Sequence, residues 1–171
     1  LLGRWRYQRR YGRIDHFVFV SHSEKRIFER DFPALKARAH VIPNAIDSRP
    51  WLADPLDRDK LIVFSARAMP EKGLAEVCAA LPVVLEARPD WKAVLLLNDW
   101  DSHKTWASPP VEALQAACGD KVEVMHSVPL TKVRDTLKRA AIALTPSLWE
   151  EPLGLTALEA HAAGAALISS G

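Results

Sequence analysis

Cysteine is scarce in this sequence, and long apolar runs are missing. Only Cys78 and Cys118 occur in 171 residues, without the Cys-x-x-Cys spacing of zinc or redox sites. We therefore expect two buried thiols of a reducing compartment, and neither a disulfide nor a zinc site. No apolar stretch approaches the roughly 20 residues of a membrane span, and nothing reads as a cleavable signal peptide. The sequence predicts a cytoplasmic protein.

Internal repeats and low-complexity tracts are also missing. The composition, 49% hydrophobic and 26% charged, is that of an ordinary soluble globular protein. A length of 171 residues suffices for one well-buried core and a fragment of a second domain.

Positive charge is concentrated at the N-terminus. Arg4, Arg6, Arg9, Arg10 and Arg13 precede the first acidic residue, whereas elsewhere the 21 acidic residues outnumber the basic ones. With aromatic residues interleaved, this segment could contact anionic lipid at the inner face of a membrane, or it could be a solvated helix face. No further basic face supports nucleic-acid binding, so no nucleic-acid partner is expected.

Strand and helix signals alternate along most of the chain. Strands are predicted at residues 17–20, 61–66, 93–97, 122–125, 141–145 and 166–169, and helices at 23–31, 73–87, 111–117, 131–140 and 153–163. The run 61–66 is apolar apart from Ser65, as in a parallel strand covered on both faces. For the five strands from residue 61 onward we predict an α/β fold with a doubly wound, Rossmann-like parallel sheet, whose ligands bind beyond the strand C-termini.

Two glutamates, Glu151 and Glu159, form a Glu-x7-Glu pair after the last long strand signal. Pro152 fits the opening turn of a helix, and at helical rise the two carboxylates would lie roughly 12 Å apart. That exceeds the separation of about 5–9.5 Å between the two catalytic carboxylates of a glycosidase, but it suits two carboxylates that bind the two ends of one extended ligand. The helix N-terminus between them would bind an anion such as a diphosphate. Alternatively, Glu150 and Glu151 are first-turn acids favoured by the helix dipole.

The surrounding residues carry a specific resemblance. Residues 146–160 read Pro-Ser-x-x-Glu-Glu-Pro-x-Gly-Leu-Thr-x-Leu-Glu-Ala, and residues 65–73 read Ser-Ala-Arg-Ala-Met-Pro-Glu-Lys-Gly. The first closely resembles the signature of the retaining GT-B glycosyltransferases of family 4 (glycosyl transferases group 1). The second resembles their Gly-Arg-x-x-Pro-Glu-Lys-Gly stretch, with Ala66 in place of glycine. The resemblance extends over about Phe17 to Gly171.

The resemblance implies the C-terminal half of a GT-B fold. Residues 1–47 would be a remnant of the N-terminal acceptor domain, 48–58 a linker, and 59–171 a truncated nucleotide-sugar-binding domain. The implied reaction is retaining transfer of a hexosyl group from a nucleoside diphosphate sugar to a saccharide or lipid-linked acceptor, without metal or cofactor. Such enzymes serve polysaccharide and lipopolysaccharide biosynthesis. We expect the isolated chain to bind the donor without transferring sugar.

Roles for individual residues carry over from the two motifs. By resemblance, Arg67 and Lys72 hold the donor diphosphate, and two fixed cations would also stabilise the charge that builds on it as the sugar leaves. Glu159 would accept hydrogen bonds from the ribose. Glu151 would lie beside the transferred sugar and complete, with the two cations, the catalytic set.

Two further parts of the donor site are expected from the same resemblance. Backbone N–H groups around Gly154 and Leu155 would cap the phosphate. The base would pack near the loop at His126, Ser127 and Val128, where the family usually has a glycine close to the first two positions.

Alternatives remain open beside this interpretation. Asp99 and Asp101 follow a buried strand and match the Asp-x-Asp metal motif of GT-A transferases, although the cationic pair already supplies the charge. The stretch 98–109 is expected to be a capping loop. A GT-B sugar-nucleotide epimerase would share the fold, and a non-catalytic sugar-nucleotide-binding module would keep the site without the chemistry.

Overall fold

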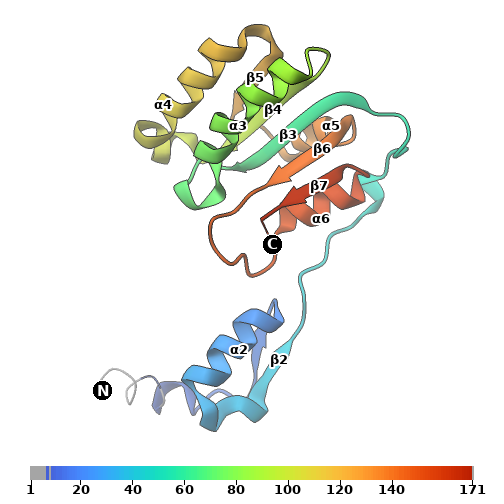
Figure 1. The fold of residues 1–171 in the computed structure, drawn as a ribbon. Coiled ribbons are helices and arrows are strands. Elements are labelled where there is room, and N and C mark those ends of the chain that lie inside the picture. The colour runs from blue at the N-terminus through green and yellow to red at the C-terminus, as the bar shows by residue number, and fades with distance from the viewer. Residues whose placement is uncertain (1–6, 8, 171) are drawn as a thin grey trace. The chain divides into compact units, whose positions relative to one another are not determined.

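The computed structural model describes residues 7 and 9–170, which group into two compact units (Figure 1). The first unit runs to Ala45 and includes Glu151–Leu153, and the second contains Ile46–Glu150 and the residues from Gly154 onward. Arg4 and Arg6 of the basic segment lie outside the described residues. Among the described residues, no helix combines the length and the apolar character that crossing a lipid bilayer demands.

The first unit is built around a small aromatic core. It contains β1 (Phe17–Phe19), α2 (His22–Asp31), a 3-10 helix (Pro33–Arg38) and β2 (Ala39–Val41), with β1 and β2 parallel. Helix α2 starts where the Ser21 hydroxyl accepts a hydrogen bond from the Glu24 amide, the usual way to satisfy a first-turn N–H. The strand and helix predicted at 17–20 and 23–31 are therefore confirmed.

The second unit is a parallel sheet of five strands with helices between them. Its elements are β3 (Asp59–Arg67), α3 (Leu74–Ala87), β4 (Lys92–Asn98), α4 (Trp100–Cys118), β5 (Val122–His126), α5 (Leu130–Leu137), β6 (Ala140–Thr145), α6 (Leu155–Ala162) and β7 (Ala166–Ser169). Short 3-10 helices cover Arg49–Trp51, Pro70–Lys72 and Gly119–Lys121. The strand order is β5-β4-β3-β6-β7, so the predicted doubly wound α/β sheet is confirmed.

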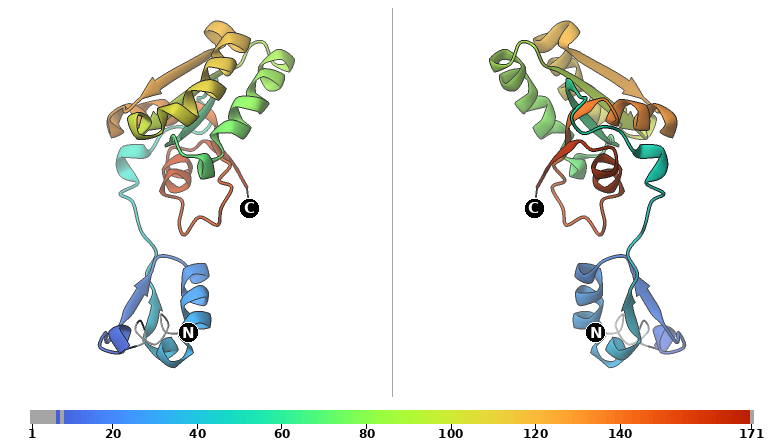
Figure 2. Two further views of the ribbon diagram at one scale, coloured as in Figure 1. Left: turned by 90° about the vertical axis from the view of Figure 1, so that its left-hand side faces the viewer. Right: turned by 90° about the vertical axis from the view of Figure 1, so that its right-hand side faces the viewer.

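Alternating side chains of β3 pack in two separate hydrophobic cores, one on each face of the sheet. Ile62 and Phe64 face α3 and α4, whereas Leu61 and Val63 face α5 and α6. Both faces of the strand are buried, which is why residues 61–66 are apolar apart from Ser65, itself buried. Figure 2 shows the helical layers from two sides. Cys78 of α3 is a free, buried thiol, and burial raises its pKa to about 11.

Helix α4 is longer than the sequence predicts. The capping loop expected at 98–109 is wrong, because the helix begins at Trp100 and continues through Pro109 and Pro110. Ala107, Val111 and Leu114 recur at spacings of four and three, and all three are buried in the core shared with α3. Packing of this face outweighs the local cost of prolines inside a helix.

Part of the predicted linker 48–58 packs on the second unit. Trp51 is buried in the core beneath α5 and α6. The Arg58 guanidinium donates hydrogen bonds to carbonyl groups near the ends of both helices, at Lys138 and Ala163. These contacts fix the segment that leads into β3.

Candidate functional site

The strand order places one crossover point in the sheet, between β3 and β6. From β3 the chain winds outward to β4 and β5, then returns to the other side of β3 through β6 and β7. At such a point the loops after two neighbouring strands leave in opposite directions, which opens a crevice at the carboxyl edge. The loops concerned are 68–73, after β3, and 146–154, after β6.

Close contacts hold these two loops together. Gly73 adopts a φ of 75°, and a Cβ atom there would lie 2.1 Å from the backbone oxygen of Pro146, so only glycine fits. One residue before Gly73, the Lys72 Nζ atom lies 5.3 Å from the centroid of the Trp149 ring. The Leu148 amide also donates to the Glu71 carbonyl at 2.8 Å. The two motifs of the sequence are therefore neighbours in space.

Arg67 lies directly before the first of these loops, and Lys72 lies within it. Arg67 is the exposed last residue of β3, and Lys72 is half-buried in the 3-10 helix Pro70–Lys72. The loop is also tied to the neighbouring strand, because the Ala68 amide donates to the Asn98 carbonyl at 2.8 Å. Two cations therefore sit on a backbone that is fixed on both sides, at the edge where ligands of such sheets bind.

Glu159 lies in the middle of α6 and is half-buried. Burial raises the pKa of its carboxyl above the ordinary value. Within the described part of the chain, its side chain has no hydrogen-bond or ion-pair partner. A partly desolvated carboxylate with no protein partner is typical of a group that meets a ligand.

Helix α6 starts later than predicted, which changes the interpretation of Glu151. The amides of Ala157 and Leu158 bond to the Gly154 carbonyl, so Gly154 caps the helix and Leu155 opens it. The prediction that Pro152 lies in the opening turn is therefore wrong. The separation of roughly 12 Å between the Glu151 and Glu159 carboxylates, which assumed one continuous helix, no longer applies. The first turn of α6 contains no acidic residue, so the alternative of first-turn acids is also wrong.

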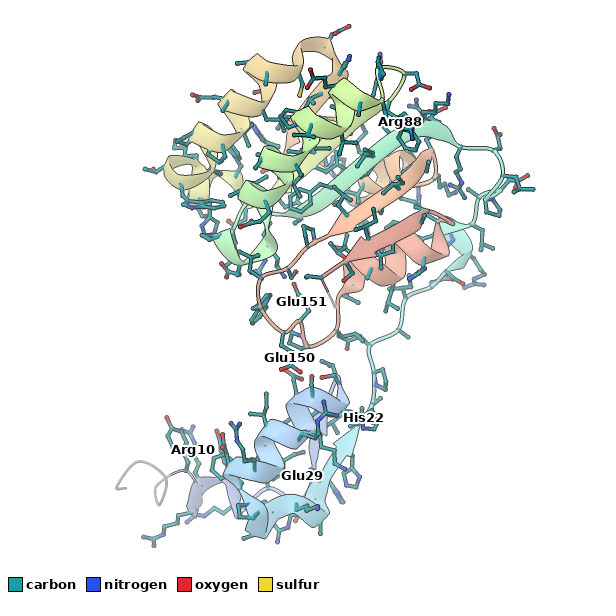
Figure 3. All side chains as sticks on the ribbon, in the orientation of Figure 1. Arg10, His22, Glu29, Arg88, Glu150 and Glu151 are labelled. Atoms are coloured by element: carbon teal, nitrogen blue, oxygen red, sulfur yellow. The ribbon has the colours of Figure 1, made fainter. Side chains whose placement is uncertain are left out.

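Glu151 instead lies on the loop between β6 and α6, beside Glu150 (Figure 3). It groups with the first unit, whereas the cations and Glu159 belong to the second. The late helix start nevertheless leaves the α6 N-terminus at the predicted residues. The amides of Leu155 and Thr156 make no backbone hydrogen bond within the described residues, as expected of a helix start.

The loop after β5 adopts, at Ser127, a conformation that glycine would adopt more easily. Ser127 adopts a φ of 50°, which L-residues other than Asn and Asp rarely do, and its amide donates to the Leu97 carbonyl at 3.0 Å. The His126 ring stacks on Trp100 with centroids 3.8 Å apart and planes within 10°. The sequence does not predict this stack, because the expected loop at 98–109 would include Trp100.

Asp99 of the Asp-x-Asp sequence is engaged by α4 itself. Its carboxylate accepts a 2.7 Å hydrogen bond from the Ser102 hydroxyl and lies 3.3 Å from the His103 ring. The Ser102 hydrogen bond is the main reason that the pKa of Asp99 is lowered, and the charges of His103 and Arg67 add to it. In the described ranges, no three His, Cys, Asp or Glu side chains gather as a metal site would require.

A groove of about 260 Å³ lies at the opposite edge of the second unit, near the amino ends of β4 and β5. Lys92, Asp120 and Lys132 are among its lining residues. None of the residues of the two motifs lines it, so the candidate site and this groove are separate.

The chain is similar to one known protein family and to two curated relatives. The model of the family "Glycosyl transferases group 1" matches residues 53–171. An alpha-maltose-1-phosphate synthase of Mycolicibacterium smegmatis is 31% identical over 172 residues, which cover 91% of this chain and 43% of that protein. The gpi3 subunit of a phosphatidylinositol N-acetylglucosaminyltransferase of Schizosaccharomyces pombe is 30% identical over 165 residues, which cover 92% of this chain and 34% of that protein. The chain thus spans less than half the length of these relatives.

Solved structures share the fold at low sequence identity. A glycosyltransferase of Rickettsia africae superposes with a TM-score of 0.80 at 17% identity, over 95% of this chain and 47% of the other. Anabaena Alr3699/HepE, crystallised with UDP and glucose, gives a TM-score of 0.75 at 15% identity, over 91% and 44%.

Proposed function

Because the chain belongs to the glycosyl transferases group 1 family, we propose that it is the donor-binding part of a transferase that uses nucleoside diphosphate sugars. The observation that carries this proposal is the junction of the loops after β3 and β6. It presents Arg67 and Lys72 next to the loop that leads into α6, at the crossover point of the sheet. The UDP bound by a structural neighbour supports the same class of ligand.

The diphosphate is the part of the donor that this junction suits best. Two cations on a fixed backbone neutralise a dianion, and they gain strength as negative charge builds on the leaving diphosphate. The open amides at Leu155 and Thr156 add donors and the positive end of the α6 dipole. This set of groups supplies the charge stabilisation that a divalent ion gives in other transferases, so the proposed reaction needs no metal or other cofactor.

The remaining candidate residues each contact a different part of the donor in this proposal. Glu159 accepts hydrogen bonds from the ribose hydroxyls, since its carboxylate has no protein partner among the described residues. Glu151 orients the transferred sugar and stabilises positive charge near its anomeric carbon. The base packs near the loop that begins at Ser127.

The proposed reaction is transfer of a hexosyl group to a saccharide or lipid-linked acceptor with retention of configuration, as in family 4. The names of the two relatives, a sugar phosphate synthase and a phosphatidylinositol N-acetylglucosaminyltransferase subunit, support sugar transfer without pointing to one acceptor. A role in polysaccharide or lipopolysaccharide biosynthesis is part of the same proposal.

A cytoplasmic location with peripheral contact to the inner face of a membrane completes the proposal. It rests on the arginine-rich N-terminal segment, of which Arg9, Arg10 and Arg13 lie within the described residues. Anionic lipid attracts such a cluster, with a contribution of about 1 kcal/mol for each basic residue near the surface.

Titration of the chain with UDP-, GDP- and ADP-sugars, each with and without EDTA, tests the proposed function. We expect one nucleotide to bind more tightly than the others, with the same affinity when EDTA is present. Binding that disappears with EDTA would favour a metal-dependent site at Asp99 and Asp101. No binding of any of the donors would contradict the proposal itself.

A further inference from the structure

Trp149 contacts a cation of the donor site, although neither sequence motif gives this residue a role. The Lys72 Nζ atom lies 5.3 Å from the centroid of the indole ring, within the about 6 Å over which an aromatic face attracts an ammonium group. The two side chains come from different loops, after β3 and after β6. Trp149 is 47% exposed, so its ring can be reached from solvent.

The backbone around the pair fixes its geometry. The residues immediately before Lys72 and Trp149 are joined by the hydrogen bond from the Leu148 amide to the Glu71 carbonyl. Next to Lys72, Gly73 packs on the Pro146 carbonyl with no room for a side chain. The ammonium and the ring therefore start from two backbone points that cannot drift apart independently.

An aromatic ring is better suited than a carboxylate to holding the Lys72 ammonium in place for a phosphate ligand. Lysine has a long, flexible side chain, and it loses rotamer freedom when a ligand fixes it. An indole face restricts the ammonium beforehand through its quadrupole, yet carries no net negative charge that would compete with a phosphate. Pre-ordering of this kind raises affinity by reducing the freedom lost on binding.

We propose that Trp149 is a positioning residue whose ring holds the Lys72 ammonium where the diphosphate of the donor binds. This inference rests on the proposed function, because it takes Lys72 to be a diphosphate ligand. It adds a residue that determines how well the site separates nucleoside diphosphates from monophosphates.

The test measures binding of a nucleoside diphosphate and its monophosphate by calorimetry, with the best-binding base among UDP, GDP and ADP. Trp149→Leu should weaken diphosphate binding roughly threefold to tenfold and leave the monophosphate almost unchanged. Trp149→Phe and Trp149→Tyr, which keep an aromatic face, should recover most of the loss. Leu148→Ala, an exposed neighbour on the same loop, is the matched control and should bind like the wild type.

A double-mutant cycle separates positioning of Lys72 from a general effect on the loop. In a Lys72→Ala background, Trp149→Leu should have no further effect on diphosphate binding. An equal additional loss there, or an equal loss for mono- and diphosphate, would overturn the role of Trp149 and leave the proposed function standing. If Lys72→Ala alone keeps wild-type diphosphate affinity, the proposed function fails at this residue and the inference fails with it.

Discussion

At the scale of single residues, the environment of Glu159 differs from that of three aspartates in the described part of the chain. Asp47, Asp90 and Asp99 all have hydrogen-bond partners that lower their pKa values. Glu159 has a raised pKa, with burial as its only cause. Ionised Glu159 therefore weakens the folded protein at neutral pH, which is the pattern of a residue kept for a ligand and not for stability.

This environment predicts a pH-dependent stability difference between the wild type and Glu159→Gln. Since the folded pKa lies above the unfolded value, near 4.5, the folded state binds more protons than the unfolded state between the two values. The wild type should lose stability relative to the variant as the pH rises through that window, and the two should be equal below it. Urea unfolding of both proteins from pH 3.5 to 7 measures the difference. A variant less stable than the wild type at neutral pH would contradict the assignment.

The proposed ribose contact makes a second prediction for the same residue. Glu159→Gln should weaken binding of a ribonucleoside diphosphate, with little effect on the 2′,3′-dideoxy analogue. A carboxylate accepts from two neighbouring hydroxyls, whereas an amide accepts through one oxygen only. Calorimetric titration of both ligands into both proteins measures the change. Equal affinity of the wild type for the two ligands would show that Glu159 does not contact the ribose.

At the scale of elements, the junction of the loops after β3 and β6 depends on Gly73. We expect Gly73→Ala to destabilise the chain by more than about 2 kcal/mol, because a strained backbone adds to a collision with a peptide oxygen that cannot move away. Gly154→Ala is the matched control, since its φ is −71° and its Cβ would meet only Ala157, at 3.5 Å. It should change stability by less than about 0.5 kcal/mol. Similar unfolding midpoints for the two variants in urea would contradict this view of the junction.

The elements also show what the sequence could and could not predict. The central strands β3 and β4 are clear because both of their faces are buried, so they appear as largely apolar runs without a competing pattern. The sequence predicts too short a helix α4, because Pro109 and Pro110 indicate a break locally, whereas packing on α3 keeps the helix continuous. The start of α6 was misplaced for a similar reason. Proline is compatible with a first turn and with the loop before it, so Pro152 alone cannot decide between them.

The candidate site was predictable to a similar degree. Arg67 ends β3 and Lys72 lies on the loop after it, because the alternation of strands and helices determines which residues reach the carboxyl edge of a parallel sheet. The contact between Lys72 and Trp149 was not predictable, since it joins side chains of two loops more than 70 positions apart. It depends on the strand order, and the alternation of elements leaves that order open.

At the scale of the whole molecule, the chain covers less than half the length of the mycobacterial and the yeast relative. The proposed site contains the groups for a nucleotide diphosphate, but nothing in the described residues has been assigned to an acceptor. We therefore expect this chain to bind a donor without transferring its sugar. Transfer needs both reactants held within about 3–3.5 Å of each other.

Incubation of the chain with a donor that it binds, followed by assay of nucleotide release and of sugar transfer, tests this expectation. We expect neither nucleotide release nor sugar transfer to occur at a rate typical of enzymes. Turnover on the order of 1 per second or faster would mean that these residues contain the whole catalytic centre.

The central claim is that Arg67 and Lys72 bind the diphosphate of a nucleotide donor, and one comparison tests it most directly. Calorimetry would measure a nucleoside diphosphate and its monophosphate against the wild type, Arg67→Ala and Lys72→Ala. Each substitution removes a charge-assisted contact, so each should weaken diphosphate binding roughly tenfold to over a hundredfold, with a smaller loss for the monophosphate. Equal losses for the two ligands, or unchanged diphosphate affinity in both variants, would contradict the claim.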